Sequence, residues 1–356
     1  KAREKLDKTD PQYAVLTKQI AAYNNQQMVR KVNLNSAYGA LGSNYFRFYD
    51  TDLAEAVTLT GQLTIRWIAR DVNAYLNRVL DTSADYVIAS DTDSIYVNLG
   101  PLVRYEDAFD NKTKDQIVTM LDRFCEQRIQ SVIDTSLDAL AKYLNVAVPC
   151  LSMKREIIAD KGVWTAKKRY MLNVYDTEGV RHSTPKLKMM GIEAVKSSTP
   201  AMARHALTRA IELLLRGTQQ EVWAFIEEQR AAFFAAPFDD VAMPRSVNGL
   251  KKYRDATKGI PIHVAGALAF NRRIEAESLV DIEPIREGAK IRFAYLREPN
   301  PFRCHVLSAM YGCPDAWQVE KYLDYDKQFQ IAIIDPLNAI LNLVGWSAEH
   351  HVSLFD

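Results

Sequence analysis

Apolar positions recur along this chain with two spacings, one typical of helices and one typical of strands. A spacing of three to four residues predicts helices over residues 1–40, 58–80, 104–147, 201–215, 218–234 and 263–273. Asp10-Pro11 suits the start of the first helix, which should end near Ala37 because Gly39 and Gly42 follow. Strand-like runs cover residues 151–158, 163–175, 186–190 and 290–296, with a hairpin turn within residues 174–180.

One short stretch, residues 86–99, places a polar centre between two apolar, β-branched flanks. It predicts a strand, a tight turn and a second strand. Thr92 separates Asp91 from Asp93 at the centre, and residues two apart in extended backbone point to the same side. Two such carboxylates repel each other unless a cation lies between them, and Mg²⁺ is typically held by one or two carboxylates. The alternative is a solvated turn, since Asp and Ser are common turn residues.

The first predicted helix carries a polar face. Lys31, Asn35 and Tyr38 follow the spacing i, i+4, i+7, so a cation, an amide and a phenol lie on one side. Over a nucleotide, this face would offer a donor for phosphate, a polar contact and an aromatic platform. The alternative is an ordinary solvated helix surface.

A second candidate surface is the run Lys167-Lys168-Arg169-Tyr170, which follows Trp164 in a predicted strand. Strand alternation would place Lys167 and Arg169 on one face and Lys168 and Tyr170 on the other. A phosphate backbone lying across one face would explain charges on both faces. An edge strand guarded by lysines is the competing explanation.

The composition fits a large globular protein. The chain has 356 residues, 48% of them hydrophobic, which is enough for two or three domains with buried cores. No run of about 18 apolar residues is present, so the sequence predicts no membrane span. The cysteines lack CxxC spacing, which favours reduced thiols over a zinc site or disulfide framework. They are Cys125, Cys150, Cys304 and Cys313.

The net charge of +1 does not by itself indicate a nucleic-acid partner, but the charges are unevenly distributed. Residues 161–196 hold eight Lys or Arg against three Asp or Glu, and residues 245–273 hold seven against one. Both stretches interleave aromatic residues, which suits contact with phosphates, although a mixed solvated surface also produces clusters. We expect an α+β fold, a sheet with helices packed to one side, followed by a mainly helical domain with one basic face.

Three motifs in this order resemble those of family B DNA polymerases, in detail the T-even bacteriophage type. Residues 35–42 resemble the fingers-helix motif, residues 91–94 the palm metal motif, and residues 167–170 the primer-strand motif. Further similarity runs through residues 185–191, 196–200 and 353–356, so it covers essentially the whole chain. Each motif alone is weakly specific, whereas the three in order are specific, and sugar transferases with a DxD motif lack the other two.

The resemblance implies a DNA-directed DNA polymerase that adds a nucleotide from a dNTP to a primer on primer–template DNA, using two Mg²⁺ ions. It implies that Asp93 ligates both ions, that Asp91 supports the site, and that Glu156 is an auxiliary carboxylate. Lys31 would neutralise the triphosphate. The implied nucleotide-binding residues are Lys31, Asn35, Tyr38, Gly39 and Thr92. The implied DNA-binding residues are Lys167, Lys168, Arg169, Tyr170, Asn248, Lys251, Lys252 and Tyr253.

The resemblance also implies an organisation into fingers (1–43), palm (44–190), thumb (191–345) and a tail that binds a sliding clamp (346–356). The family carries another metal-ligating Asp in a DxxSLYPS-type motif, a first fingers helix and an exonuclease domain, and none of these is found in this sequence. We therefore expect an N-terminal polymerase half, as a missing segment or as the other subunit of a split polymerase. The expected location is the cytoplasm of an infected bacterial host. The alternative is a non-catalytic subunit that binds DNA and tethers the clamp.

Overall fold

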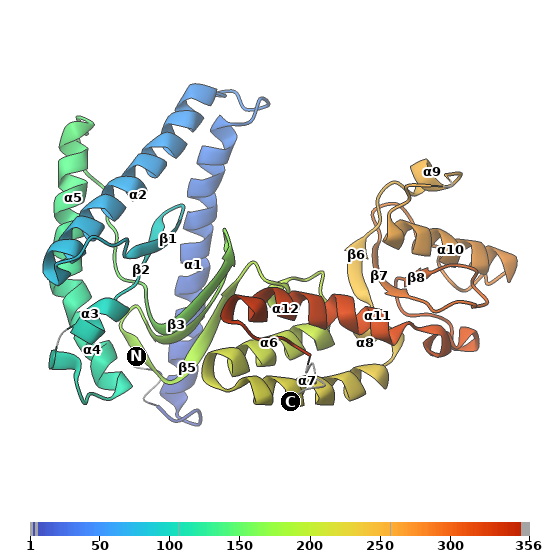
Figure 1. Cartoon of the computed structure of the whole chain (residues 1–356). Coiled ribbons are helices and arrows are strands. Elements are labelled where there is room, and N and C mark those ends of the chain that lie inside the picture. Colours follow the sequence, from blue (N-terminus) through green and yellow to red (C-terminus); the bar gives the residue numbers. More distant parts are fainter. Residues whose placement is uncertain (1–2, 4–5, 106, 257, 350–356) are drawn as a thin grey trace. The chain divides into compact units, whose positions relative to one another are not determined.

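The computed structural model describes residues 3, 6–105, 107–256 and 258–349 and has an α+β fold with three small antiparallel sheets (Figure 1). The predicted fold class is confirmed. The chain divides into two compact units. Unit 1 comprises residues 1–158 and 175–185, and unit 2 comprises residues 159–174 and 186–356. Among the residues described, no helix is long and apolar enough to cross a membrane.

Unit 1 begins with two long helices, α1 (Pro11–Leu41) and α2 (Thr51–Leu80). Asp10 caps α1 as predicted, accepting a hydrogen bond from the backbone N–H of Gln12 at 2.8 Å. The predicted end of this helix near residue 37 is wrong. A lone glycine costs a helix only about 1 kcal/mol relative to alanine, so α1 continues through Gly39.

The second helix also departs from its predicted start at residue 58. Asp50 caps α2 by accepting a hydrogen bond from the N–H of Leu53 at 3.0 Å, so α2 begins at Thr51. Four side chains at intervals of four residues on α2 are buried in the core of unit 1: Ile68, Val72, Leu76 and Leu80. This stripe fixes which face of α2 lies against the rest of the unit.

A hairpin and a group of helices complete unit 1. They are β1 (Val87–Asp91), β2 (Ser94–Val97), α3 (Gly100–Tyr105), η2 (Asp107–Phe109), α4 (Lys114–Phe124), η3 (Cys125–Ile129) and α5 (Gln130–Tyr143). The π-helical turn η3 joins α4 directly to α5. Helix α2 packs against α5 and against both strands of the β1–β2 hairpin. The hairpin predicted for residues 86–99 is confirmed.

The next sheet has the order β3–β4–β5 and contributes to both units. Its strands are β3 (Ile157–Ala166), β4 (Arg169–Thr177) and β5 (Val180–Met190). The ends of the strands next to the β4–β5 turn belong to unit 1, and the remainder belongs to unit 2. This turn contains Glu178 and Gly179, both with positive φ, as the predicted hairpin turn requires. Residues 151–156 are not strand, which corrects the earlier start predicted for β3.

Unit 2 combines helices with the third sheet, of order β6–β7–β8. Its elements are η4 (Glu193–Val195), α6 (Ala201–Arg216), α7 (Gln219–Phe234), α8 (Phe238–Val241), β6 (Met243–Ser246), α9 (Leu250–Tyr253), α10 (Ile262–Ala276), β7 (Lys290–Tyr295), β8 (Val306–Ala309), η5 (Asp315–Trp317), η6 (Val319–Tyr322), α11 (Tyr325–Phe329), η7 (Gln330–Ile334), α12 (Asp335–Leu341) and η8 (Asn342–Val344). The predicted helices α6, α7 and α10 and strand β7 are confirmed. Strands β6 and β8 were not predicted; both are short, and unlike β2 neither is joined to its partner strand by a tight turn.

Helix α10 packs closely on β8, and one glycine permits this approach. A Cβ atom at Gly266 would lie 2.5 Å from the Oγ of Ser308, which is fully buried. The same Oγ donates a hydrogen bond to the carbonyl of His263 at 2.9 Å. The buried Ser308 hydroxyl thus has a hydrogen-bond acceptor on the helix that packs against it.

Candidate active site and nucleic-acid interface

The β1–β2 hairpin places the acidic motif at its turn. Asp91, the last residue of β1, pairs with Ser94, the first residue of β2, so Thr92 and Asp93 form the connection. Asp93 is exposed and Asp91 is half-buried. The prediction for these two carboxylates assumed extended backbone from Asp91 to Asp93, and this assumption is wrong because the chain turns between them.

The connection has the hydrogen bond of a γ-turn. The N–H of Asp93 donates to the carbonyl of Asp91 at 2.6 Å, and the intervening Thr92 has φ of 54°. A β-branched residue at positive φ is uncommon and strained. The Thr92 hydroxyl donates to the Asp91 carboxylate at 3.0 Å, and the Ser94 hydroxyl donates to the Asp91 carbonyl at 3.1 Å. The turn is therefore held by local hydrogen bonds that leave the Asp93 carboxylate on the surface.

Two asparagines of α2 anchor the segment that leads into this hairpin. The Asn73 side-chain carbonyl accepts hydrogen bonds from the N–H groups of Tyr86 at 2.9 Å and Val87 at 3.0 Å. Asn77, one turn later, exchanges two hydrogen bonds with the backbone of Ala84, at 2.8 and 2.9 Å. These two asparagines were not predicted from the sequence. Their signal is a pair of poor helix formers spaced four residues apart in a helix just before the acidic motif.

A β-bulge at Ile88 also shapes the hairpin. Val87 pairs with Val97 and Ala89 pairs with Tyr96, so Ile88 is the extra residue of β1. Its side chain is half exposed. Bulges increase local twist and redirect the residues that follow, and here the residues that follow lead to Asp91.

Helix α1 carries the predicted nucleotide-binding residues. Lys31, Asn35, Tyr38 and Gly39 are all exposed. Lys31 and Asn35 line an open depression along α1, together with Tyr23, Gln26, Gln27, Arg30 and Leu34. The structure thus brings Lys31 and Asn35 together and adds Arg30, a second cation that the sequence analysis did not single out.

Glu156 is exposed and directly precedes β3. Its carbonyl accepts a hydrogen bond from the N–H of Glu178 at 2.7 Å. Within the described part of the chain, no three His, Cys, Asp or Glu side chains form a group that could hold a metal ion. Glu156 therefore does not join Asp91 and Asp93 in such a group in this structure.

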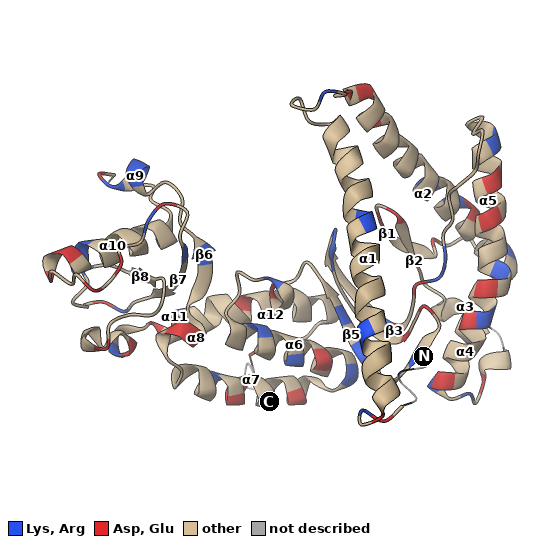
Figure 2. Cartoon of the chain, turned by 180° about the vertical axis from the view of Figure 1, so that it is seen from behind, with Lys and Arg blue, Asp and Glu red and all other residues tan. Residues whose placement is uncertain are grey.

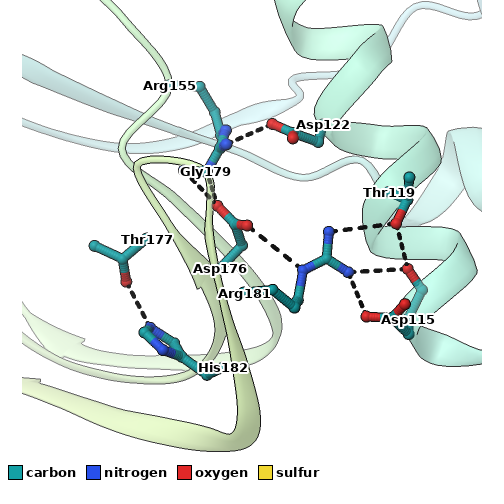
Figure 3. A network of polar contacts seen from close by, with 9 residues as sticks. All are labelled: Asp115, Thr119, Asp122, Arg155, Asp176, Thr177, Gly179, Arg181 and His182. Carbon is teal, nitrogen blue, oxygen red and sulfur yellow. Dashed lines mark hydrogen bonds and ion pairs between the residues drawn. The ribbon is translucent and has the colours of Figure 1, made fainter. Parts of the chain in front are cut away.

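The residue before Glu156, Arg155, is the centre of a polar network in unit 1 (Figure 3). Its guanidinium binds the carboxylates of Asp122 on α4 and Asp176 on β4. Asp176, whose side chain is only 2% exposed, also accepts hydrogen bonds from the N–H of Gly179 at 2.9 Å and from Arg181 at 3.5 Å. The network joins α4, the segment before β3 and the β4–β5 turn.

Opposing effects act on the pKa of Asp176. Burial by itself would raise this pKa. The hydrogen bond and the charge of Arg155, with smaller contributions from Gly179 and Arg181, outweigh burial and hold the pKa below its ordinary value. The carboxylate is therefore ionised at neutral pH although it is buried.

In unit 2, the predicted primer-strand residues form a turn instead of a continuous strand. Lys167 and Lys168 connect β3 to β4, and Lys168 has φ of 61°. The predicted alternation of faces across the four residues is wrong, because a two-residue turn interrupts the strand. Both lysines are exposed, whereas Tyr170 is 5% exposed and its ring stacks on Trp164 at 6.1 Å between centroids.

The segment after β5 braces this lysine turn. Gly191 has φ of 67°, and a Cβ atom there would lie 2.2 Å from the carbonyl oxygen of Lys168. Glu193 binds Arg169 at 2.7 Å and Lys196 at 2.9 Å. Burial would raise the pKa of Glu193, but hydrogen bonds, first from Lys196, lower it overall.

A second basic surface of unit 2 lies after β6. We call residues 247–254 the basic loop. It contains α9 and carries three exposed cationic side chains, those of Lys251, Lys252 and Arg254. Asn248 is exposed and Tyr253 is half-buried, with the Lys252 ammonium 5.1 Å from the centroid of the Tyr253 ring. The colouring of Figure 2 shows basic residues gathered on α9.

Comparison with known proteins bears on all of these surfaces. The sequence model of DNA polymerase family B matches residues 2–113, which include α1, α2 and the acidic hairpin. The chain is 33% identical over 349 residues to the DNA-directed DNA polymerase of Enterobacteria phage T4 and 34% identical over 346 residues to that of Escherichia phage RB69. Each alignment covers 93% of this chain. Over nearly its whole length the chain is similar to these phage DNA polymerases, and its first third matches the family B model.

Similarity to DNA polymerases extends beyond those of phages. DNA polymerase 1 of Pyrococcus abyssi is 22% identical over 331 residues, covering 91% of this chain and 35% of the archaeal protein. The chain spans 38% of the length of each of the two phage polymerases. Because the phage alignments cover nearly all of this chain, the resemblance noted in the sequence analysis is confirmed at the level of the family.

Proposed function

We propose that this chain forms part of a DNA-directed DNA polymerase and carries half of its catalytic centre. The observation that carries the proposal is the exposed Asp93 on a strained turn, anchored to α2, within the region that matches family B. Strained backbone persists at functional sites, where the surrounding structure holds it in place. The reaction would add a nucleotide from a dNTP to the 3′-hydroxyl of a primer.

The donor set of the hairpin turn suits Mg²⁺, because this ion takes one or two protein carboxylates and completes its shell with water and substrate phosphates. Asp93 would ligate both ions, and Asp91, fixed by the Thr92 hydroxyl, would support the site. Two bound Mg²⁺ ions would supply activation of the primer hydroxyl and charge neutralisation on the pyrophosphate. Glu156 is proposed only as an auxiliary carboxylate.

The exposed face of α1 would bind the incoming nucleotide. Lys31, with Arg30 beside it, would neutralise the triphosphate, and Asn35 would add a polar contact. Tyr38 and Gly39 would pack against the nascent base pair, and Thr92 would contact the nucleotide from the hairpin. In these roles the side chains would either neutralise the charge of the incoming nucleotide or hold it in position.

Unit 2 would bind the duplex through its phosphates. Lys167 and Lys168, exposed at the β3–β4 turn, suit the primer strand, with Arg169 and Tyr170 supporting that turn. The basic loop, with Asn248, Lys251, Lys252 and Tyr253, suits the duplex further along. Phosphate contacts of this kind hold DNA in register without selecting its sequence.

We further propose that the remaining palm and fingers come from polypeptide outside this chain. In support, α1 buries none of its side chains, and large apolar residues along it are exposed. Apart from Tyr38, which is assigned to the nascent base pair, these exposed residues are Val15, Ile20, Tyr23, Met28, Val29, Val32 and Leu34. Many large apolar side chains left exposed along one helix favour contact with other protein.

The proposed organisation keeps fingers (1–43), palm (44–190), thumb (191–345) and a clamp-binding tail. Residues 353–356, on which the sliding-clamp proposal depends, lie outside the residues that the structure describes. The clamp is proposed as a partner on the resemblance of the sequence alone.

Primer extension tests the proposed function. The chain is assayed alone and mixed with the polypeptide that supplies the remaining palm and fingers, with Mg²⁺ and four dNTPs. Synthesis that requires both polypeptides supports the proposal. A mixture that binds primer–template DNA in a salt-dependent way but synthesises nothing contradicts it and favours a non-catalytic DNA-binding subunit.

A further inference from the structure

The basic loop follows a short strand, and its conformation depends on contacts outside itself. Residues 247–249 precede α9, a helix of only four residues that cannot stabilise itself. Leu250 is buried at 8% exposure, whereas the next two residues, Lys251 and Lys252, are exposed. A fixed loop therefore presents two adjacent cations on the surface of unit 2.

One acidic side chain holds the start of this loop. The carboxylate of Glu287 accepts hydrogen bonds from two consecutive backbone amides, one oxygen from the N–H of Gly249 and the other from the N–H of Leu250 at 2.9 Å. Hydrogen bonds between an ionised carboxylate and backbone amides are stronger than those between neutral groups. Both carboxylate oxygens are used for the loop.

The backbone next to Glu287 reinforces this attachment. The N–H of Val247 donates to the carbonyl of Ala289 at 2.9 Å, and the N–H of Gly288 donates to the carbonyl of Val247 at 2.7 Å. Four hydrogen bonds thus join residues 247–250 to residues 287–289, directly before β7. These hydrogen bonds hold the start of the basic loop in place, so its conformation does not depend on the stability of the short helix α9.

The backbone conformation at Gly249 strongly favours glycine. Gly249 has φ of 85°, and a Cβ atom there would lie 3.1 Å from the ring of Tyr253. The N–H of Tyr253 in turn donates to the Gly249 carbonyl at 3.0 Å. Holding this glycine in place fixes the turn of chain on which the lysines stand.

We propose that Glu287 is a positioning residue for DNA binding, which fixes the basic loop so that Lys251 and Lys252 contact phosphates together. This inference rests on the proposed function. It predicts that removing the Glu287 carboxylate weakens DNA binding, whereas the change in net charge alone would strengthen it. Near a polyanion a carboxylate is repulsive, so its removal should strengthen binding if charge alone matters.

The chain offers a matched control in Glu283, which is exposed and pairs with Arg286 at 3.5 Å. Binding of a labelled primer–template duplex is measured over a range of salt concentrations for the wild type, Glu287→Ala and Glu283→Ala. Both substitutions raise the net charge by the same amount. We expect Glu283→Ala to bind as well as the wild type or better, and Glu287→Ala to bind about 5–20-fold more weakly.

The salt dependence of binding gives a second measurement, the slope of log K against log salt, which general destabilisation of the fold would not change. If two phosphate contacts are lost, the slope of log K against log salt becomes shallower by about 1–2. Glu287→Gln, which keeps one neutral acceptor oxygen, should give intermediate affinity. Gly249→Ala strains the same loop but keeps the Glu287 carboxylate, and it should also weaken DNA binding. If Glu287→Ala does not fold, the affinity of Gly249→Ala tests whether the conformation of the basic loop matters for binding.

Two results would overturn the inference in distinguishable ways. Binding by Glu287→Ala and Gly249→Ala that equals that of Glu283→Ala, with an unchanged salt slope, contradicts the positioning role alone. A wild-type chain without salt-dependent duplex binding contradicts the proposed function, and the inference with it.

Discussion

At the scale of single residues, two tight turns carry the candidate chemistry, and both contain a non-glycine residue at positive φ. Thr92 lies between the two aspartates of the acidic hairpin, and Lys168 lies in the exposed lysine turn. Such conformations cost of order 1–3 kcal/mol and persist where neighbouring contacts enforce them. Around Thr92 these are hydrogen bonds to Asp91, and around Lys168 it is the close backbone of Gly191.

The first prediction concerns Gly191. Gly191→Ala should lower the free energy of unfolding by about 2–4 kcal/mol, because the new Cβ would meet the Lys168 carbonyl and a positive φ is itself unfavourable. Gly345→Ala is the matched control, since Gly345 also has a positive φ of 75° but nothing within 4 Å of its Cβ position. We expect about 1 kcal/mol for the control. Equal losses in urea denaturation would mean that Gly191 does not brace the lysine turn.

At the scale of secondary-structure elements, the polar network of Figure 3 holds three separate segments together. Arg155 bridges α4 and β4, and Arg181 on β5 binds Asp115 on α4 at 2.7 Å. Breaking a buried charge pair by removing one partner costs about 3–5 kcal/mol, because the other charge stays buried without compensation. The network therefore fixes the segment that carries Glu156.

The second prediction concerns pH. Because the pKa of Asp176 is lowered in the folded state, its ionised form adds stability above the unfolded pKa of about 3.9. That contribution is lost as the pH falls through the folded value. The wild type should therefore lose stability between about pH 5 and pH 3, and Asp176→Asn should lose less over the same range.

Urea denaturation at several pH values between 7 and 3 checks this prediction. Parallel pH dependence for the wild type and Asp176→Asn would contradict the role assigned to the Arg155 network. At neutral pH, Asp176→Asn itself should be less stable by about 2–4 kcal/mol, since Arg155 then loses its buried partner.

Much of the element order was predictable from hydrophobic periodicity and capping residues. The acidic hairpin, the β4–β5 turn, and helices α6 and α7 were predicted because alternation, turn residues and caps agree locally. Helix α1 was predicted to end too early, because the glycine rule ignores the helical residues on both sides of Gly39. Strands β6 and β8 were missed, since these short strands pair with β7 across long connections and not through a tight turn, so no local turn signal marks them.

The residues proposed for the candidate site come from the sequence, whereas the contacts that support them come only from the structure. Asp91, Asp93 and Lys31 stand out because their spacing has a chemical meaning. Asn73 and Glu287 have no such pattern in the sequence. Each accepts hydrogen bonds from backbone amides that are distant along the chain, and such pairs are seen only in the tertiary structure. The burial of Tyr170 likewise depends on packing that alternation alone does not fix.

At the scale of the whole molecule, the main feature is apolar surface on a helix that has no core of its own. Leu34 on α1 is 73% exposed, and Tyr23 is 68% exposed. The third prediction follows. Leu34→Gln should leave the stability of this chain within about 0.5 kcal/mol of the wild type, because the side chain is solvated. It should weaken association with the polypeptide that supplies the remaining palm and fingers about tenfold or more.

Val280→Gln is the control for this prediction, since Val280 is 91% exposed in unit 2 and belongs to no proposed interface. Titration of the labelled chain with the partner polypeptide measures both variants. Equal affinity of Leu34→Gln and Val280→Gln for the partner would contradict an interface on α1.

The most direct test of the account is the rate of primer extension by the completed polymerase carrying Asp93→Asn. The account predicts that nucleotide addition falls by about a thousandfold or more, equivalent to about 4 kcal/mol of lost transition-state stabilisation. Primer–template affinity should stay within about twofold of the wild type. Asp110→Asn, an exposed aspartate in the same unit, should extend primers normally. Extension by Asp93→Asn at the wild-type rate would contradict the claim that this hairpin is catalytic.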